Sequence, residues 1–334
     1  MTQRPAHHGA DGRFRNPWPG EDAGKRSLMD VLRWRASRAR DGVPPTPPEA
    51  AFPVGTPDIT DTISAGERAR ITWVGHSTFL IQVAGRNVLT DPVWSERASP
   101  FASMGPRRMT PPAVLFDDLP PIHTVLLSHD HYDHLDESTV RRLHARFGEA
   151  VEWVTPLGYR DWFGRRGITR VTELDWWQSR TEGQGPASMK VTAFPARHWT
   201  QRGWNDVRRR LWCSFAIEAA DGTRIYFGGD SGYAAFYREI GAREPGFDVV
   251  ILPVGAYDPR WFMAPAHMNP EDAVDAYRDL GGSGLFIPMH WGTFRLADDP
   301  PLEPPVRLRA AWRAAGLPDS QLMVPRHGDT VKLP

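Results

Sequence analysis

The chain carries its strongest structural signal in Thr124-Val125-Leu126-Leu127-Ser128-His129-Asp130-His131-Tyr132-Asp133-His134, where an apolar run meets three histidines and two aspartates. The run is typical of a short buried β-strand, and the rigid end of such a strand aims the loop that follows it. Imidazole and carboxylate groups are ligands that suit zinc, iron or manganese. The cluster holds more ligands than one tetrahedral ion uses, so the sequence predicts two metal ions.

Histidine and aspartate residues, which can bind metal ions, also follow three other predicted strands. The pattern occurs three times, with His198 after residues 190–194, Asp230 after 224–227 and His290 after 285–288. Ends of neighbouring strands meet at one edge of a sheet. We therefore expect these side chains to converge on the cluster.

Composition narrows the class of protein. The chain has 334 residues with 40% hydrophobic and 24% charged residues, which is enough apolar material for a sizeable core. Forty Lys and Arg balance forty Asp and Glu, so the protein has no overall positive charge that would favour binding of nucleic acid. Cys213 is the single cysteine of the sequence, which excludes an internal disulfide. We find neither a signal peptide nor an apolar run of about 20 residues that would span a bilayer. These features predict a cytoplasmic protein.

The predicted organisation is an N-terminal extension over residues 1–60 and one large domain over 61–334. The extension is rich in Pro, Gly and Arg and holds one short basic helix over 27–40, where Ser27 and Asp30 have the spacing of a capping box. This helix is either a solvated helix packed on the main domain or a surface that touches anionic lipid headgroups.

Strands and helices alternate in the large domain, which favours one α/β sandwich with sheets inside and helices outside. The first predicted element is a hairpin of residues 71–83 and 88–90. The other predicted strands are 124–127, 151–155, 190–194, 214–218, 224–227, 249–253 and 285–288, and the predicted helices are 137–147, 271–280 and 306–315.

Longer stretches carry a resemblance to a known family. The motif from His129 to His134 resembles the signature of the metallo-β-lactamase superfamily, and so do Gly75-His76-Ser77-Thr78 and Gly229-Asp230-Ser231-Gly232. Within it, the chain resembles the N-acyl-phosphatidylethanolamine-hydrolysing phospholipase D family. The stretches that carry this second resemblance are 12–19, 97–100, 104–106, 173–177, 255–263, 290–294 and 326–329.

The resemblance implies a metallo-β-lactamase-like αββα sandwich of two mixed sheets with helices on the outer faces. It also implies two Zn²⁺ per chain, without excluding Fe or Mn. By matching position, the first zinc ligands are His129, His131 and His198, the second are Asp133, His134 and His290, and Asp230 bridges the two ions.

Two such ions lower the pKa of a bridging water and hold a phosphate oxygen. The resemblance thus implies a phosphodiesterase of phospholipase D type, in which hydroxide attacks N-acyl-phosphatidylethanolamine or a related phospholipid. The products are phosphatidic acid and an N-acylethanolamine. An alternative is that the same two metal ions catalyse hydrolysis of a lactone or another ester. A less favoured alternative is a metal-binding protein without enzymatic activity. The partners we expect are a phosphodiester substrate, a peripheral membrane contact and a homodimer partner, and not a specific nucleic acid.

Several other side chains are candidates for supporting roles. Asp133 is expected to orient the attacking water. His267 is either a catalytic residue that contacts substrate or donates a proton, or a residue at a helix entry before Asn269 and Pro270. Asp91 is expected to orient a metal ligand, and His76 is expected either to do the same or to pack in the core. His327 either supports a ligand as well or lies in a surface loop. The candidates for substrate contacts are Trp199, Arg202, Tyr257 and Arg260.

Overall fold

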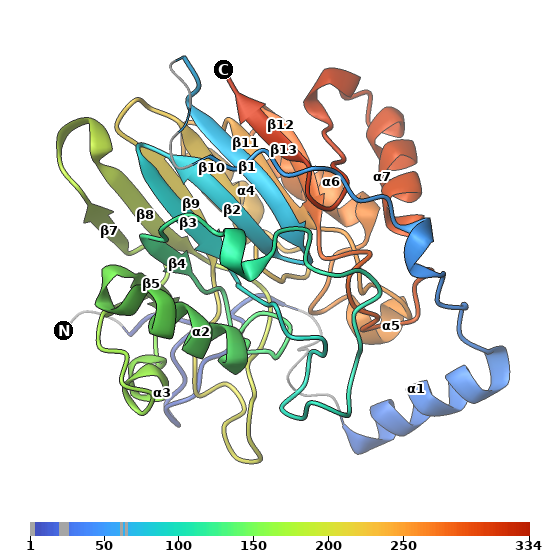
Figure 1. Cartoon of the computed structure of the whole chain (residues 1–334). Helices are drawn as coiled ribbons and strands as arrows, with labels where there is room; N and C mark the ends of the chain where they lie inside the picture. The colour runs from blue at the N-terminus through green and yellow to red at the C-terminus, as the bar shows by residue number, and fades with distance from the viewer. Residues whose placement is uncertain (1–3, 20–26, 61–62, 64–65) are drawn as a thin grey trace.

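Two β-sheets stacked face to face form the centre of the molecule in the computed structural model (Figure 1). The structure describes residues 4–19, 27–60, 63 and 66–334. One sheet has the strand order β13-β1-β2-β3-β4-β5-β6 and the other the order β12-β11-β10-β9-β8-β7. Their strands are β1 (Ala69–Gly75), β2 (Thr78–Val83), β3 (Arg86–Thr90), β4 (Thr124–Leu126), β5 (Glu152–Pro156), β6 (Val171–Leu174), β7 (Ser179–Glu182), β8 (Met189–Phe194), β9 (Ser214–Ala219), β10 (Arg224–Phe227), β11 (Val249–Pro253), β12 (Leu285–Met289) and β13 (Thr330–Leu333).

Both sheets are mixed. In the first sheet β13, β1, β2 and β3 pair antiparallel, and β3, β4, β5 and β6 pair parallel. In the second, β12, β11 and β10 are parallel, whereas β10, β9, β8 and β7 are antiparallel. The predicted αββα sandwich of two mixed sheets is therefore confirmed.

Helices cover the outer faces, as expected from the sequence. The helices are α1 (Leu28–Asp41), α2 (Glu137–Phe147), α3 (Arg160–Gly164), α4 (Phe236–Arg243), α5 (Arg260–Met263), α6 (Pro270–Asp279) and α7 (Glu303–Ala314). Successive residues of a strand point to opposite faces of its sheet. Trp73 therefore lies in the core between the sheets, whereas Val74 packs with Val140 of α2 and Phe163 of α3. The second sheet packs against α4, α6 and α7.

One predicted strand is wrong in its extent. The apolar pattern over residues 71–83 predicted a single strand containing His76, but the structure has two strands, β1 and β2, joined at His76 and Ser77. Gly75 and His76 have φ values of 142° and 55°, which regular strand geometry does not accommodate. The chain therefore turns back at His76 and places this side chain at the sheet edge.

Several elements lay outside the predicted set. They are β6, β7, β13, α3, α4 and α5. Three of the four residues of β7 are exposed, so this strand has no apolar run that a sequence pattern would detect.

Helix α1 begins as the sequence predicts and packs on the main domain. Ser27 accepts a hydrogen bond from the Asp30 backbone, and the Asp30 side chain accepts one from the Ser27 backbone. Trp34 stacks on Phe262 at 4.8 Å between ring centroids and donates a hydrogen bond to Asp298. Leu28, Met29 and Leu32 of the same helix remain exposed.

The first segment of the chain also packs on the large domain. Asn16 donates a hydrogen bond to the carbonyl of His198, and Trp18 stacks on Trp176. His7 Nε2 lies 2.7 Å from Asp175 Oδ1. The expected boundary at residue 60 falls beside residues 61–62, which lie outside the described residues.

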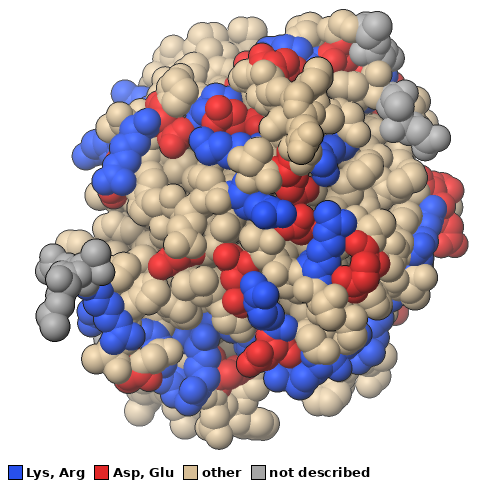
Figure 2. All heavy atoms as spheres, turned by 90° about the vertical axis from the view of Figure 1, so that its left-hand side faces the viewer, with Lys and Arg blue, Asp and Glu red and all other residues tan. Residues whose placement is uncertain are grey.

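Charge is dispersed on the visible surface. Figure 2 shows Lys and Arg interspersed with Asp and Glu over the face on the left of Figure 1, in keeping with the zero net charge. Among the described residues, none of the helices combines the length and apolar character needed to span a bilayer.

Candidate metal centre

The loops after β4, β8, β10 and β12 bring the predicted ligands together at one edge of the sandwich. The first group consists of His129, His131 and His198. His131 Nδ1 lies 3.0 Å from His129 Nε2 and 3.1 Å from His198 Nε2. The three nitrogens face one point, as expected of ligands that share one ion.

The second group surrounds the carboxylates of Asp133 and Asp230. His134 Nε2 lies 3.3 Å from Asp133 Oδ2 and 3.2 Å from Asp230 Oδ2. His290 Nε2 lies 3.4 and 3.1 Å from the same two oxygens. Asp230 Oδ2 is also 3.9 Å from His129 Nε2, so this carboxylate stands between the two groups.

These donor atoms fit metal ions. Ligand atoms that bind a tetrahedral zinc at about 2.0–2.1 Å lie about 3.3–3.4 Å from one another, close to the separations in the second group. Buried atoms without a hydrogen-bond partner among the described residues include His131 Nε2, His134 Nε2, His290 Nε2 and Asp230 Oδ1. Buried polar atoms are normally satisfied, so the unpaired nitrogens of His134 and His290 and the oxygen of Asp230 indicate a cation binding site.

The electrostatics divide the histidines into two sets. Burial lowers the pKa of His129 and His198 well below the ordinary value, which keeps their rings neutral. Burial by itself would lower the pKa of His290 too, but the Asp230 and Asp133 carboxylates raise it to about 9. Without a cation, the second group therefore holds a proton at neutral pH that a metal ion would displace.

Hydrogen bonds from the surrounding chain orient the ligands. Asp91 Oδ2 accepts a hydrogen bond from His134 Nδ1 at 2.7 Å, the contact expected of a residue that orients this ring. His76 Nε2 lies 2.9 Å from Asp133 Oδ2 and donates to this carboxylate. His198 Nδ1 donates to the carbonyl of Ala266 at 3.0 Å. These bonds leave the opposite ring nitrogens of His134 and His198 free to face the metal site.

The turn at His76 has its own support. The His76 backbone N–H donates to Thr293 Oγ1, and the same hydroxyl lies 3.0 Å from His327 Nε2. His327 is buried and stacks on Trp73, with ring centroids 4.0 Å apart. The alternative of a surface loop is therefore wrong for His327, which supports the turn that carries His76.

His267 lies beside the metal centre and also precedes a helix. Its Nδ1 is 3.8 Å from Asp230 Oδ2 and has no hydrogen-bond partner among the described residues. Asn269 caps α6, whose first residue is Pro270. Burial lowers the pKa of His267 to about 4, which favours a neutral ring. The sequence could not separate the two roles, and the structure places the residue both beside the ligand cluster and at the entry of α6.

A cavity of about 600 Å³ opens onto the centre. His131, Asp133, Asp230 and His267 line its polar end. The rest of the wall is largely apolar and consists of Val31, Trp34, Ala98, Trp199, Val207, Ala256, Phe262, Met263, Ala266 and Leu296, with Tyr132 and Gln201. Helix α1 thus contributes to the cavity, a role that no local signal in residues 27–40 revealed.

The four residues expected to contact substrate lie in different places. Trp199 lines the cavity, and its ring lies 4.7 Å from that of His131. Arg260 holds the carbonyl of His267 at 2.9 Å and also bonds Asp272, so it acts on the position of His267. Tyr257 is buried, and Arg202 donates to two backbone carbonyls outside this cavity. Of the four, only Trp199 lines the cavity.

Comparison with known proteins places this geometry in a family. Residues 86–291 match the beta-lactamase superfamily domain. An uncharacterised protein of Mycobacterium tuberculosis is 42% identical over 268 residues, which are 79% of this chain and 69% of that protein. N-acyl-phosphatidylethanolamine-hydrolyzing phospholipase D 1 of Caenorhabditis elegans is 38% identical over 229 residues, which are 67% of this chain and 64% of the relative.

A solved structure shares the fold at low sequence identity. Igni18, a metallo hydrolase of the archaeon Ignicoccus hospitalis, superposes with a TM-score of 0.59 at 20% identity, covering 80% of this chain and 98% of its own. The match over residues 86–291 spans more than half of the 334 residues, and the His/Asp cluster lies at the strand ends within it. The chain therefore belongs to the beta-lactamase superfamily.

Proposed function

We propose that this protein is a dinuclear zinc phosphodiesterase of phospholipase D type that acts on N-acyl-phosphatidylethanolamine or a related phospholipid. The observation that carries the proposal is the cavity, because an apolar wall leads directly to the ligand cluster. An acyl chain matches the wall formed by Trp34, Phe262 and Leu296, and a phosphodiester matches the polar end. The 38% identity to a phospholipase D that hydrolyses this lipid supports the same substrate class.

In this proposal the residues of the two groups would hold two zinc ions, which would lower the pKa of a bound water and place a positive field beside the phosphate. The chain itself positions the groups. Asp91 and His76 hold His134 and Asp133 in orientation through hydrogen bonds. Asp133 reaches the cavity, where its carboxylate would accept a hydrogen bond from the water that attacks the substrate.

His267 serves in the proposal as a substrate contact. A ring with a pKa of about 4 is neutral at pH 7, so it holds no spare proton for a leaving alcohol. Its unpaired Nδ1 lies 3.8 Å from Asp230 Oδ2, and both residues line the cavity, so in the proposal this nitrogen forms a hydrogen bond with the headgroup. Arg260 fixes this position through the His267 carbonyl.

A lipid substrate also requires an approach to a lipid surface. Leu28, Met29 and Leu32 are exposed on α1, whose Val31 and Trp34 line the cavity. We propose that this helix contacts the membrane peripherally and that acyl chains enter beside it. A cytoplasmic location and a homodimer stay predictions from the sequence.

The test is hydrolysis of N-acyl-phosphatidylethanolamine in mixed micelles by protein of measured metal content. Products are identified by mass spectrometry, and Asp230→Asn serves as the inactive variant. We expect about two zinc ions per chain and release of N-acylethanolamine by the unaltered protein only. Two bound zinc ions without hydrolysis of the lipid would contradict the proposed substrate class. A panel of lactones and other esters would then be tested as substrates. Protein that takes up no metal would contradict the enzyme itself.

A further inference from the structure

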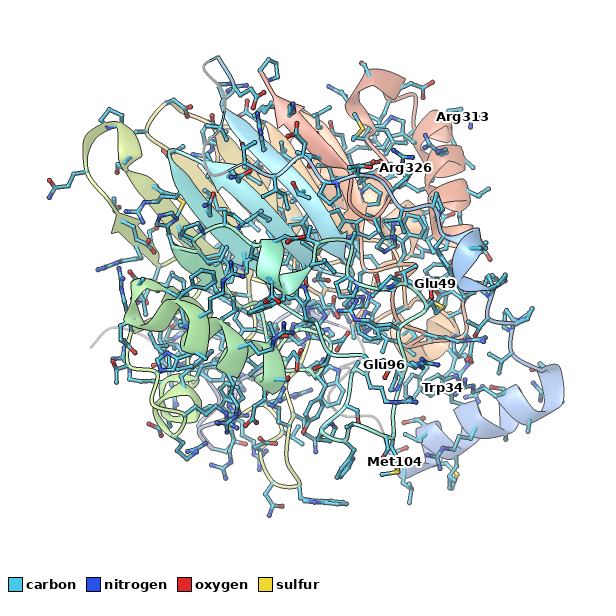
Figure 3. All side chains as sticks on the ribbon, in the orientation of Figure 1. Trp34, Glu49, Glu96, Met104, Arg313 and Arg326 are labelled. Carbon is cyan, nitrogen blue, oxygen red and sulfur yellow. The ribbon has the colours of Figure 1, made fainter. Side chains whose placement is uncertain are left out.

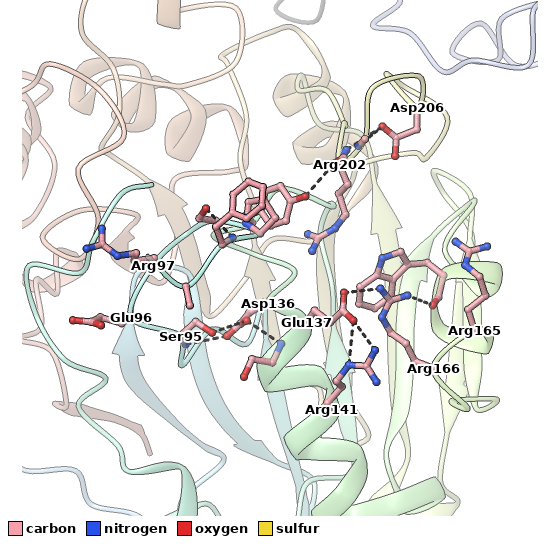
Figure 4. Close-up of a pocket in the computed structure, with 18 of the residues that line it drawn as sticks. Ser95, Glu96, Arg97, Asp136, Glu137, Arg141, Arg165, Arg166, Arg202 and Asp206 are labelled. Carbon is pink, nitrogen blue, oxygen red and sulfur yellow. Dashed lines mark hydrogen bonds and ion pairs between the residues drawn. The ribbon is translucent and has the colours of Figure 1, made fainter. Parts of the chain in front are cut away.

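A second hollow, of about 910 Å³, lies next to the substrate cavity (Figure 4). Tyr132 lines both spaces. The walls of the hollow come from residues 95–102, the start of α2, the end of α3 and the loop over 202–210. Asp133 and His267, the side chains proposed to act on the substrate, do not line it, whereas Arg202, which the sequence offered as a substrate contact, does.

The hollow is rich in arginine. Its lining includes Arg97, Arg141, Arg165, Arg166, Arg202 and Arg210, against the four acidic residues Glu96, Asp136, Glu137 and Asp206. Figure 4 shows Glu137 between Arg141 and Arg166, and its carboxylate accepts hydrogen bonds from them at 2.7 and 2.6 Å. The single negative charge of Glu137 is thus shared by two guanidinium groups.

Two of the other carboxylates are engaged elsewhere. Asp136 caps α2 and accepts from the backbone N–H groups of Trp94 and Ser95. Glu96 forms its ion pair with Arg107, which does not line the hollow. These two acids therefore do little to neutralise the arginines.

Three of the arginines have no carboxylate partner among the described residues. Arg202 donates to the carbonyls of Asp130 and Leu135 at 2.8 and 2.7 Å, and Arg97 donates to the carbonyl of Gly105. The side chain of Arg165 makes no hydrogen bond or ion pair with the described part of the chain and is exposed. Arg202 is half-buried, and burial lowers its pKa, so a nearby anion would stabilise its charge.

Buried donor atoms are also available. Arg166 Nε and Arg210 Nε have no hydrogen-bond partner among the described residues. Guanidinium groups donate two parallel hydrogen bonds to phosphate oxygens, so a cluster of them suits a phosphate with several unesterified oxygens. The chemistry indicated is a phosphomonoester.

Exposed apolar side chains lie at the rim of the hollow. Phe101 lines the hollow and is 57% exposed, and Met104, in the same loop, is 58% exposed. Trp204 follows Gly203 of the opposite wall and is 97% exposed. In Figure 3, Met104 lies on the same edge of the molecule as α1. A soluble anion needs no such rim, whereas a lipid headgroup brings apolar chains beside it.

We propose that this hollow binds the phosphomonoester headgroup of an anionic phospholipid on the surface from which the enzyme takes its substrate. The choice of a lipid as the carrier of the phosphate rests on the proposed function. The anion site rests on the arginines alone. Phosphatidic acid has this headgroup and is also the proposed product, so the site would retain the enzyme where product accumulates.

The test measures binding without turnover. Zinc-loaded protein is sedimented with phosphatidylcholine vesicles that contain or lack phosphatidic acid, and sn-glycerol 3-phosphate binding is measured by calorimetry. The variant is Arg97→Ala/Arg165→Ala, and the control Arg309→Ala/Arg313→Ala removes the same charge from exposed positions of α7, where Figure 3 labels Arg313. We expect about tenfold weaker binding to phosphatidic acid vesicles for the variant and no change for the control.

Any other result would contradict a specific part of the proposal. Equal binding by the variant and the control would overturn the site. Glycerol phosphate binding that the variant loses, without any preference for phosphatidic acid vesicles, would overturn the lipid and leave a site for soluble phosphomonoesters. Activity on mixed micelles of N-acyl-phosphatidylethanolamine and neutral detergent, without added phosphatidic acid, is expected to be unchanged in the variant, so loss of binding to phosphatidic acid vesicles is distinguishable from failure of the proposed reaction.

Discussion

Replacement of Asp91 by Asn tests how far buried hydrogen bonds control the metal centre. The Asp91 carboxylate accepts from His134 Nδ1 at 2.7 Å, from the Ser128 backbone N–H at 2.7 Å and from Ser128 Oγ at 2.6 Å. An amide of the same shape turns one of the two oxygens into a donor. In one orientation the new N–H₂ meets His134 Nδ1–H, and in the other it meets the Ser128 N–H. Either way, one charge-assisted hydrogen bond is replaced by a contact between two donors.

The expected cost follows from the position of His134 in the second group of ligands. Loss of such an outer hydrogen bond weakens metal binding about 10- to 100-fold, or about 1.4 to 2.7 kcal/mol. Zinc held by His134 should weaken by this factor. Zinc held by the first group should change less, because Asp91 reaches His129 only through Ser128 Oγ, which lies 2.9 Å from His129 Nδ1.

The assay is zinc content at a series of buffered free-zinc concentrations, with the melting temperature measured on the same samples. Asp319→Asn, at an exposed position, is the matched control. Two zinc ions bound with unchanged affinity in a folded Asp91→Asn protein would refute the reasoning. Loss of both ions together with a collapse of the melting temperature would assign Asp91 to the fold and not to the metal centre.

The geometry makes further predictions. Asp230→Asn should abolish tight binding of both zinc ions and His198→Ala that of mainly one, as counted by elemental analysis; equal loss in both variants would contradict a bridging Asp230. Because His290 has a pKa of about 9 and holds its proton below that pH, zinc added at pH 7 should release protons to an indicator dye, and the release from this residue should decline above pH 9. Asn16→Ala removes the 2.9 Å hydrogen bond to the His198 carbonyl and should weaken zinc at the first group by about 1 kcal/mol, without effect on the second. Trp34→Ala should lower kcat/KM for substrates with long acyl chains about tenfold more than for substrates with short ones. An equal fall for both would show that the acyl chain does not bind against Trp34.

The convergence of the candidate metal ligands was predictable because each of them follows an apolar strand that the sequence makes visible. His198, Asp230 and His290 come from distant parts of the chain, yet the same signal precedes each one. Parallel strands such as β10, β11 and β12 place their carboxyl ends at one edge, and this geometry converts three separate signals into one site. The strand ends, more than the histidines themselves, are therefore the informative feature.

The turn at His76 was not predictable in this way. Hydrophobic alternation continues on both sides of Gly75 and His76, so periodicity extends one strand across the break. The turn depends on contacts from the far end of the chain, where Thr293 and His327 support the His76 backbone. A local pattern contains no information on such partners.

The substrate cavity illustrates the same limit and has a consequence for the function. Trp34 reaches the cavity because it packs on Phe262 and bonds Asp298, and Asn16 reaches the metal centre through the carbonyl of His198. Neither contact is encoded near the residue that makes it. The metal ligands belong to the sandwich, whereas part of the apolar wall belongs to α1. Changes in the N-terminal extension should therefore alter which lipid enters the cavity while the second group of ligands, held by Asp91 and His76, keeps its geometry.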